Sequence, residues 1–436
     1  MSSNLQHVYV VNPQQQQVTF PSCISICDIV PIDVNVINNC ISICDTVPID
    51  VNIDKTRSID AGGIQQWDAD FVDGNLALLW DTSTTESATV TDVTAQAARS
   101  LNTTTASGDI AIIQARQRQI YQLGTSKRII VGGLLGAKKT NVTKRIGFFD
   151  TDDGLFFEQT GSSLSVVTRT SASGSAVDTA VDQASWNIDP LNGTGPSGLT
   201  LDETKIQFFI IEYDYHGAGR VFFGFRLNNN IIYVHKQDFA NVVTLPFITR
   251  PTLAIRCEIR NTGSVASSTS LKIYSGSVIS FSSSNPVHID RAIDLGSSGK
   301  VITTSLTPLL SVRLKSAFNK NLIRLNRLNL FVASGSVVRW VLIFNPTTLT
   351  GPTYVSIASD SIGEFDTVAT AVSGGTEIVS GYLDNNNGVL SQGDFTGLYF
   401  LSSNIAGTAD VMTLAAQRGA GTATIYASLG LEEYKR

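Results

Sequence analysis

Residues 220–237 read RVFFGFRLNNNIIYVHKQ, and this stretch decides the fold class. Two runs rich in aromatic and β-branched residues flank Asn228, Asn229 and Asn230, and such runs around a short turn predict a β-hairpin. Asparagine tolerates the left-handed backbone that such a turn needs. We therefore expect two antiparallel strands here, and similar patterns recur along the chain.

Comparable strand patterns lie on both sides of this hairpin. RIGFFD, TDDG and LFFEQ around Gly154 predict a second hairpin, and Ile206–Tyr215 reads as a strand that is apolar on both faces. Leu253–Arg260 alternates apolar and charged residues, so one face should be buried. Regular short strands with turns between them are typical of a β-sandwich. The one helical candidate is Thr91–Leu101, with a strand as the alternative.

The 436 residues are enough for two or three domains with cores of their own. We predict an all-β protein of two β-sandwich domains, jelly-roll or concanavalin-like, preceded by an extended N-terminal arm. The arm spans residues 1–58, the first sandwich 59–290 and the second 291–436. Alternation of strands and helices is not seen, which argues against a Rossmann or barrel enzyme.

Composition narrows the function classes. Charged residues make up 16% of the chain, against roughly 25% in an ordinary globular domain, and neutral polar residues fill the gap. Such a surface is common in extracellular adhesins and virus particles. The net charge of −6 gives no sign of a basic face for nucleic acid. We see neither a signal peptide nor an apolar run of about 18 residues, so we expect no membrane partner.

The arm contains a repeat. CISICDIVPIDVNV at Cys23–Val36 returns as CISICDTVPIDVNI at Cys40–Ile53. Taken as extended chains, both copies place β-branched side chains on one face, and such a strand can dock by adding to the sheet edge of a partner. The alternative is a hairpin on this protein's own domain. The predicted partner contacts are Ile24, Ile26, Val30, Ile32, Val34, Val36, Ile41, Ile43, Val47, Ile49, Val51 and Ile53.

The four arm cysteines form two C-x3-C pairs, which resemble a zinc ligand set. Cysteines four residues apart in a strand lie roughly 13 Å apart, too far for one ion. We therefore predict no metal site and no cofactor. The fifth cysteine, Cys257, sits in an apolar stripe and is interpreted as a core residue.

Other candidate motifs favour structural interpretations. GTGPSG at Gly193–Gly198 lacks the strand and helix that a phosphate loop needs. Asp150–Gly154 and Asp384–Gly388 resemble calcium loops in composition, but their register does not fit. His216 lies near Asp214 and is interpreted as a surface histidine, so no catalytic residue is predicted.

Two further groups of residues point to surfaces. Paired phenylalanines such as Phe148 with Phe149 and Phe208 with Phe209 place one ring on each face of a sheet, so the outer ring needs a cover. A sugar platform or a subunit interface would supply one. The basic residues resemble a solvated strand face or a subunit contact: Arg313, Lys315, Lys320, Arg324 and Arg327.

One stretch resembles a known family. RIGFFDTDDGLFFEQTGSSLSVVTRT and the later WNID, GTGPSG and LD order resemble a module of structural proteins of tailed bacteriophages, cyanophages among them, and of some large DNA viruses. The resemblance covers about residues 107–260. It implies a concanavalin-like sandwich on a virion component, and it implies no catalytic residues.

These observations lead to one functional prediction and two alternatives. We predict a non-enzymatic structural component of a virus particle, as a head decoration, head fibre, tail or baseplate protein. It would be made in the host cytoplasm, anchored through its arm to capsid or tail subunits, and assembled as a homo-oligomer, a trimer. The first alternative is a carbohydrate-binding adhesin that recognises a host receptor. The second is a glycan hydrolase with Glu158, Glu212 and Asp214 as candidate carboxylates.

Overall fold

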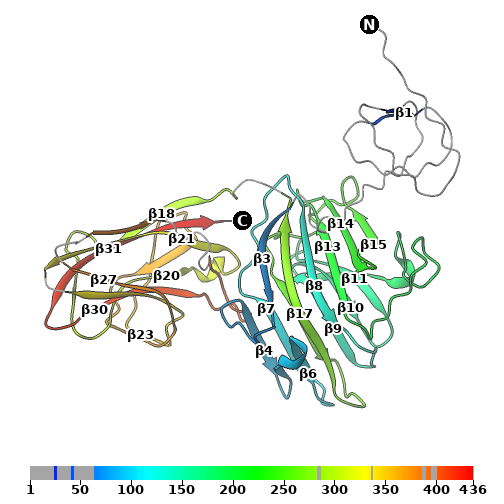
Figure 1. Ribbon diagram of the computed structural model, residues 1–436, viewed down its shortest axis with the longest axis horizontal. Helices are drawn as coiled ribbons and strands as arrows, with labels where there is room; N and C mark the ends of the chain where they lie inside the picture. Colours follow the sequence, from blue (N-terminus) through cyan, green and yellow to red (C-terminus); the bar gives the residue numbers. More distant parts are fainter. Residues whose placement is uncertain are drawn as a thin grey trace, which may run out of the picture. The chain divides into compact units, whose positions relative to one another are not determined.

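The described residues are almost entirely β-structure (Figure 1). The computed structural model describes residues 63–281, 286–334, 337–384, 389–393 and 400–435, together with Ile24–Ile26 and Ile41–Ile43. The helical segments within these ranges are single 3-10 turns: η1 (Thr94–Gln96), η2 (Gln183–Ser185) and η3 (Ser316–Phe318).

No helix in the described part of the chain has the length and apolar character that crossing a membrane requires.

The first sandwich consists of two antiparallel sheets. The seven-stranded sheet has the order β12 (Val177–Asp182), β11 (Leu164–Thr170), β10 (Gly154–Gln159), β9 (Val142–Phe149), β16 (Ile255–Asn261), β7 (Ile110–Ala115) and β4 (Trp80–Thr85). The eight-stranded sheet has the order β15 (Asn230–Asp238), β14 (Arg220–Leu227), β13 (Gln207–Tyr213), β8 (Lys127–Leu134), β17 (Thr269–Ser280), β6 (Ala98–Thr103) and β5 (Thr89–Val93), with β3 (Ile64–Asp70) on β17.

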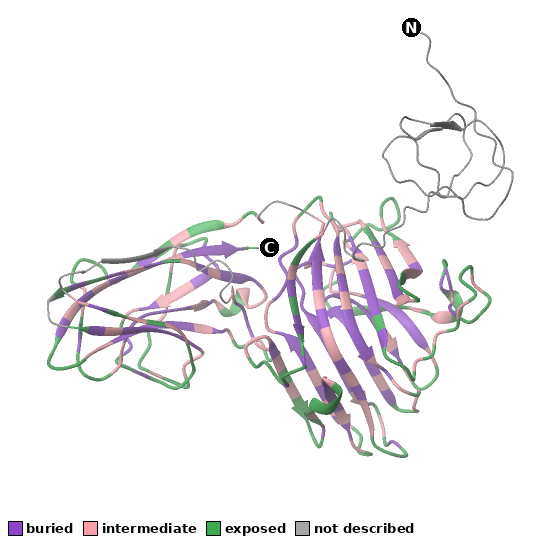
Figure 2. Cartoon of the chain, in the orientation of Figure 1, coloured by how far each residue is buried: buried purple, intermediate pink, exposed green. Residues whose placement is uncertain are grey.

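Alternation along each strand builds the core between these sheets. Ile255, Cys257 and Ile259 of β16 are fully buried in it, whereas Arg256 and Glu258 point to the opposite face. Figure 2 shows that most residues along the strands of this sandwich are buried. The apolar residues of this alternating strand therefore lie together on the core face, as the sequence predicts, because side chains two residues apart share a face. Cys257 is a free, buried core thiol, as expected.

The hairpins form at the predicted turns. β14 pairs with β15 in register from Leu227 with Asn230, and Asn228 and Asn229 have positive φ angles of 49° and 65°. Two successive left-handed residues make the turn type whose twist matches a hairpin.

The helical candidate at Thr91–Leu101 is wrong. These residues belong to β5, the single turn η1 and β6, which pair with each other. Ala97 takes a left-handed φ of 48° where the chain reverses. Threonine and valine prefer extended structure, and the strand pairing outweighs the helix-forming alanines.

The second sandwich also has two sheets. One has the order β18 (Ile289–Asp294), β31 (Ala423–Tyr434), β21 (Leu322–Ser334) and β28 (Val389–Gly393), with β19 (Lys300–Ile302) on β31 and β29 (Phe400–Leu401) on β21. The other has the order β24 (Val355–Ser356), β25 (Gly363–Asp366), β20 (Thr307–Leu314), β30 (Val411–Arg418), β22 (Val338–Phe344) and β27 (Thr376–Leu383). A separate pair is β23 (Thr348–Thr350) with β26 (Ala371–Ser373).

Each sandwich has its own apolar core. One cluster of buried residues runs from Trp67 to Val278 and the other from Ile293 to Leu431. The predicted all-β fold with two β-sandwiches is confirmed. The strands of the first sandwich end at Ser280 and those of the second begin at Ile289.

The repeat of the arm is described at two short strands. β1 (Ile24–Ile26) and β2 (Ile41–Ile43) pair in parallel, with Ile24 opposite Ile41 and Ile26 opposite Ile43, so equivalent positions of the two copies face each other. The remaining predicted contacts of the arm and its four cysteines lie outside the described residues.

Candidate functional site

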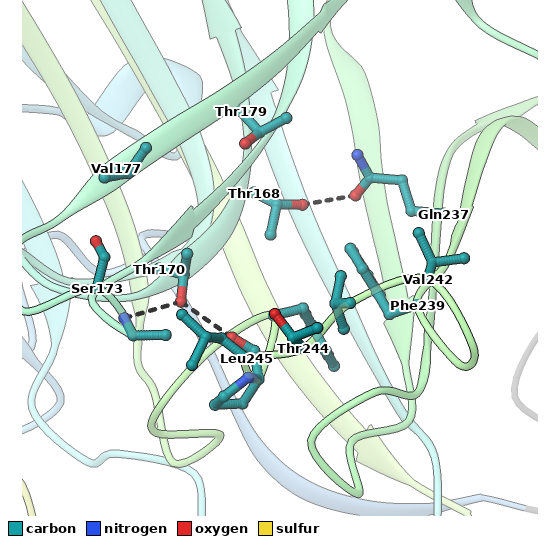
Figure 3. A pocket seen from close by; sticks show the side chains of 14 residues that line it. Thr168, Thr170, Ser173, Val177, Thr179, Gln237, Phe239, Val242, Thr244 and Leu245 are labelled. Atoms are coloured by element: carbon teal, nitrogen blue, oxygen red, sulfur yellow. Dashed lines mark hydrogen bonds between the residues drawn. The ribbon is translucent and has the colours of Figure 1, made fainter.

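A groove of about 440 Å³ opens at one edge of the first sandwich (Figure 3). It lies between strands β11 and β12 of one sheet, the end of β15 of the other, and the loop that follows β15. Its lining consists of Thr168, Thr170, Ala172, Ser173, Val177, Thr179, Gln237, Phe239, Val242, Val243, Thr244, Leu245, Pro246 and Phe247.

The topology explains why a groove forms here. β12 and β15 are the terminal strands of their sheets, so no further strand covers the space between them. Thr168 and Thr179 occupy inward-facing positions at this edge. In the centre of the sandwich, the corresponding positions are phenylalanine or isoleucine. The Thr168 hydroxyl donates a 2.6 Å hydrogen bond to Oε1 of Gln237, which links the two sheets across the groove.

An aromatic pair and an apolar loop form the other wall. The rings of Phe239 and Phe247 stack with centroids 4.4 Å apart and an angle of 3° between their planes. Val242 and Leu245 of the same loop are 72% and 52% exposed, and Figure 3 shows both from this loop. Apolar side chains left this open commonly mark a binding surface.

The groove offers hydrogen bonds and apolar contact without charge. None of its lining side chains is ionisable. Threonine hydroxyls both donate and accept, and the glutamine amide does the same through two atoms. A site of this chemistry suits a neutral ligand with many hydroxyl groups, but its lining residues cannot transfer a proton at neutral pH.

A second feature lies on the outer face of the seven-stranded sheet. Arg145 of β9 binds Glu158 of β10 through a 2.7 Å contact and Glu258 of β16 through a 3.4 Å contact. The three residues occupy one row across adjacent strands, because Glu158 and Glu258 are both register partners of Arg145. Two carboxylates thus flank one guanidinium.

Aromatic rings fill the layer beneath these charges. Phe149 and Phe156 are fully buried on the outward side, and the guanidinium of Arg145 lies 5.5 Å from the Phe156 ring centroid. A side chain at Gly147 would meet the backbone of Phe156 at 2.6 Å. Glycine therefore lets the ring lie against β9. Arginine side chains thus cover the outer rings Phe149 and Phe156, whereas the outer ring of Phe208 on the other sheet stays 40% exposed.

Arginine side chains on this face lower the pKa of two carboxyl groups. Burial alone would raise the pKa of Glu258, but Arg256 and Arg145 outweigh burial and keep this pKa below its usual range. The same holds for Asp178, where burial is opposed by its hydrogen bond and ion pair with Arg169.

The carboxylates predicted for a hydrolase do not converge. Glu158 points outward from the seven-stranded sheet, whereas Glu212 points outward from the eight-stranded sheet, where it binds Arg128 and Tyr233. Asp214 accepts a hydrogen bond from the Arg220 amide. Their core neighbours Phe157 and Ile211 lie between the sheets, so the two glutamates occupy opposite surfaces of the sandwich.

The loop motifs have structural roles in the described residues. Burial would raise the pKa of Asp150, but Arg118 and Lys320 hold it well below its usual range. In the GTGPSG loop, the Ser197 amide donates to Asp189 over 2.8 Å. His216 is exposed, as predicted. The second calcium-like stretch, Asp384–Gly388, lies mostly outside the described residues.

Four of the five residues in the basic cluster bind groups of this chain. Arg313 binds Glu364, the Lys315 ammonium donates to the Ser361 carbonyl, and Arg324 binds Glu432. Lys320 binds Asp150 and Asp152 at 3.0 and 2.7 Å. These side chains therefore serve as internal ion pairs and carbonyl contacts.

Two features of the site were missed by sequence reasoning. The threonines of β11 and β12 and Gln237 come from segments about 70 residues apart and match no motif. Glu258 was interpreted only as the polar side of an alternating strand. Its position opposite Arg145 depends on β16 pairing with β9, which no local pattern specifies.

Known proteins were compared with this chain. No protein-family model matches the sequence, and no curated protein matches it. Among solved structures, a glycosyl hydrolase family 16 protein from Mycobacterium smegmatis is similar, with 9% identity and a TM-score of 0.34 over 49% of this chain and 100% of that chain. A beta-1,3-glucanase from Mycobacterium marinum has 12% identity and a TM-score of 0.35 over 50% and 99%.

A carbohydrate recognition domain, that of Emp47p, is also similar, with 12% identity and a TM-score of 0.32 over 53% of this chain and 100% of that chain. At these identities the likeness concerns the fold. Because glycosyl hydrolases are among the similar structures, the prediction that the chain is not an enzyme is contradicted and is withdrawn.

Proposed function

We propose that this chain binds a neutral carbohydrate in the groove between β11, β12 and β15. The observation that carries the proposal is the lining of the groove, which combines threonine hydroxyls and a glutamine amide with the stacked rings of Phe239 and Phe247 and has no charged side chain. Sugar hydroxyls need such donors and acceptors, and the C–H faces of a sugar ring pack on aromatic side chains. The volume of about 440 Å³ is in the usual range of ligand sites.

A glycan array with the full chain tests this proposal. We expect binding to neutral glycans, and we expect Thr179→Val and Thr244→Val each to weaken it about fivefold, because each removes one hydrogen bond worth about 1 kcal/mol. Both changes keep the side-chain shape.

The matched control is Thr85→Val on β4, the opposite terminal strand of the same sheet. It should leave glycan affinity unchanged. Absence of binding to every neutral glycan, or equal affinity of the groove variants and the wild type, would contradict the proposal.

A second candidate function is glycoside hydrolysis, and the row of Glu158, Arg145 and Glu258 favours it. Carboxylates on strands two positions apart are about 9.6 Å apart at their backbones, close to the spacing of about 6.5–9.5 Å in inverting glycosidases. Arg145 binds both carboxylates, so a substrate would have to displace it before one glutamate could act as an acid. Release of reducing ends from polysaccharides should then disappear in Glu158→Gln and Glu258→Gln but persist in Glu212→Gln.

The proposed setting is the surface of a virus particle, where the arm would anchor the chain to capsid or tail subunits and a homotrimer would present the grooves. The sequence resemblance and the low charge support this setting. Detection of the chain in purified particles by mass spectrometry would test it.

A further inference from the structure

Three metal-ligating side chains gather at the edge of the second sandwich. The ligand atoms of His288, Asp290 and Glu432 all lie within 4.8 Å of one another. Asp290 of the terminal strand β18 is the direct register partner of Glu432 in β31. Two like charges directly opposite each other destabilise a sheet. A cation between them would relieve that repulsion.

The imidazole is oriented for coordination. Nδ1 of His288 lies 3.1 Å from the Pro286 carbonyl oxygen. A carbonyl oxygen can only accept, so Nδ1 carries a proton, and in the neutral imidazole Nε2 then presents its lone pair. Nε2 lies 3.8 Å from Oδ1 of Asp290. Metal-bound histidines almost always donate their other ring N–H to a carbonyl or carboxylate in this way.

Glu432 is held through one of its two carboxylate oxygens. Arg324 Nε donates to Oε2 over 2.7 Å, and the Tyr434 hydroxyl donates to the same oxygen over 2.6 Å. These contacts fix the buried carboxylate through Oε2, so Oε1 would have to serve as the metal ligand. The positive charge of Arg324 opposes a metal ion, so the affinity should be lower than that of a closed site with four protein ligands.

We propose that His288, Asp290 and Glu432 bind one divalent transition-metal ion, with water completing the coordination. An imidazole with two carboxylates suits Zn²⁺, whereas Ca²⁺ and Mg²⁺ prefer oxygen ligands alone. Two ligands of a tetrahedral zinc ion are about 3.4 Å apart, so the ligand atoms must close by up to about 1.4 Å from their present limit of 4.8 Å. Asp290 can move, because its side chain is 75% exposed.

The ion would join β18 to the central part of its sheet. Only Ile293 of β18 is buried, so this terminal strand has little apolar contact of its own. A metal that binds the folded protein and not the unfolded chain raises the melting temperature. The site would therefore stabilise the second sandwich in proportion to metal concentration.

Zinc titration of the full chain tests the proposal. Because cysteine thiolates are general zinc ligands, the four arm cysteines are replaced by serine at positions 23, 27, 40 and 44, so that the titration reports the proposed site. We expect isothermal titration calorimetry to give one Zn²⁺ per chain, with a higher Tm on Zn²⁺ addition and no effect of Ca²⁺. His288→Ala should abolish zinc binding, and so should Asp290→Asn, which changes an exposed side chain and keeps the fold.

The matched control is His216→Ala, which removes a surface histidine from the first sandwich and should bind zinc normally. The proposal would be overturned if the chain with the four arm cysteines replaced binds no zinc, if Asp290→Asn and His288→Ala both keep wild-type affinity, or if Ca²⁺ binds as tightly as Zn²⁺.

Discussion

Replacing Arg145 with methionine should lower the free energy of unfolding of the first sandwich by about 3 kcal/mol. The arginine side chain is 12% exposed and its partner Glu258 is 7% exposed. Removing the guanidinium leaves Glu158 and Glu258 with less compensation in a layer that water reaches poorly. An unpaired buried charge costs more than the pair contributed when intact. Chemical denaturation followed by tryptophan fluorescence would measure the change.

The destabilisation should depend on pH. The folded-state pKa of Glu258 is lowered, so its ion pairs contribute stability above its unfolded-state pKa of about 4.3 and lose it as the pH falls through the folded value. The Arg145→Met variant lacks the ion pair between Arg145 and Glu258, so it lacks that part of the stability at every pH. The difference between variant and wild type should therefore be largest near neutral pH and shrink below about pH 4.

Arg220→Met is the matched control. Arg220 also binds a carboxylate, Asp238 at 2.7 Å, and also lies over a phenylalanine, Phe222, but both charged side chains are about half exposed. Exposed ion pairs contribute about 0–1 kcal/mol. If both variants lose the same unfolding free energy, burial of the ion pairs does not explain the destabilisation by Arg145→Met.

Replacing Phe157 with alanine should cost about 3–5 kcal/mol of unfolding free energy. Phe157 lies at the centre of the first core, with ring centroids 5.3 Å from Phe209, 5.6 Å from Phe223 and 4.9 Å from Phe225. Alanine would leave a cavity between both sheets and remove three aromatic contacts.

Both sandwiches of this chain unfold in denaturant, so the tryptophan fluorescence change must be assigned to one of them. Trp67, Trp80 and Trp186 belong to the first core and Trp340 to the second, and a Trp340→Phe background would make fluorescence report the first alone. The control is Phe208→Ala, which removes a ring that is 40% exposed on the outward side of β13 and should cost less than about 1 kcal/mol. A loss of less than about 1 kcal/mol of unfolding free energy for Phe157→Ala would contradict the prediction and show that the core repacks around the cavity.

Local patterns in the sequence were enough to predict the fold class. The alternation at Ile255, Cys257 and Ile259 and the asparagine turn at Asn228 and Asn229 depend on neighbouring residues alone, and the structure confirms both. The same local reasoning misread Thr91–Leu101, because strand pairing of β5 with β6 overrides the helical preference of the alanines.

The candidate sites could not be predicted because distant residues form them. Gln237 meets Thr168 across 69 residues, and Arg145 meets Glu258 across 113. Asp290 and Glu432 are likewise 142 positions apart and become neighbours only through the pairing of β18 with β31. Order of strands within a sheet is set by the whole fold, so no spacing or motif in the sequence reveals such pairs.

The position of the last long strand in each sandwich has a consequence for biosynthesis. β17 lies between β8 and β6 in its sheet, and β31 lies between β18 and β21. Each is translated after all the other strands of its sandwich, so the nascent chain holds two half-sheets with unpaired inner edges until that strand leaves the ribosome. The first sandwich can close while the second is still being synthesised. Slow translation after Ser280 should therefore favour correct folding, whereas a stall before Ala423 should expose the second sandwich to chaperones or aggregation.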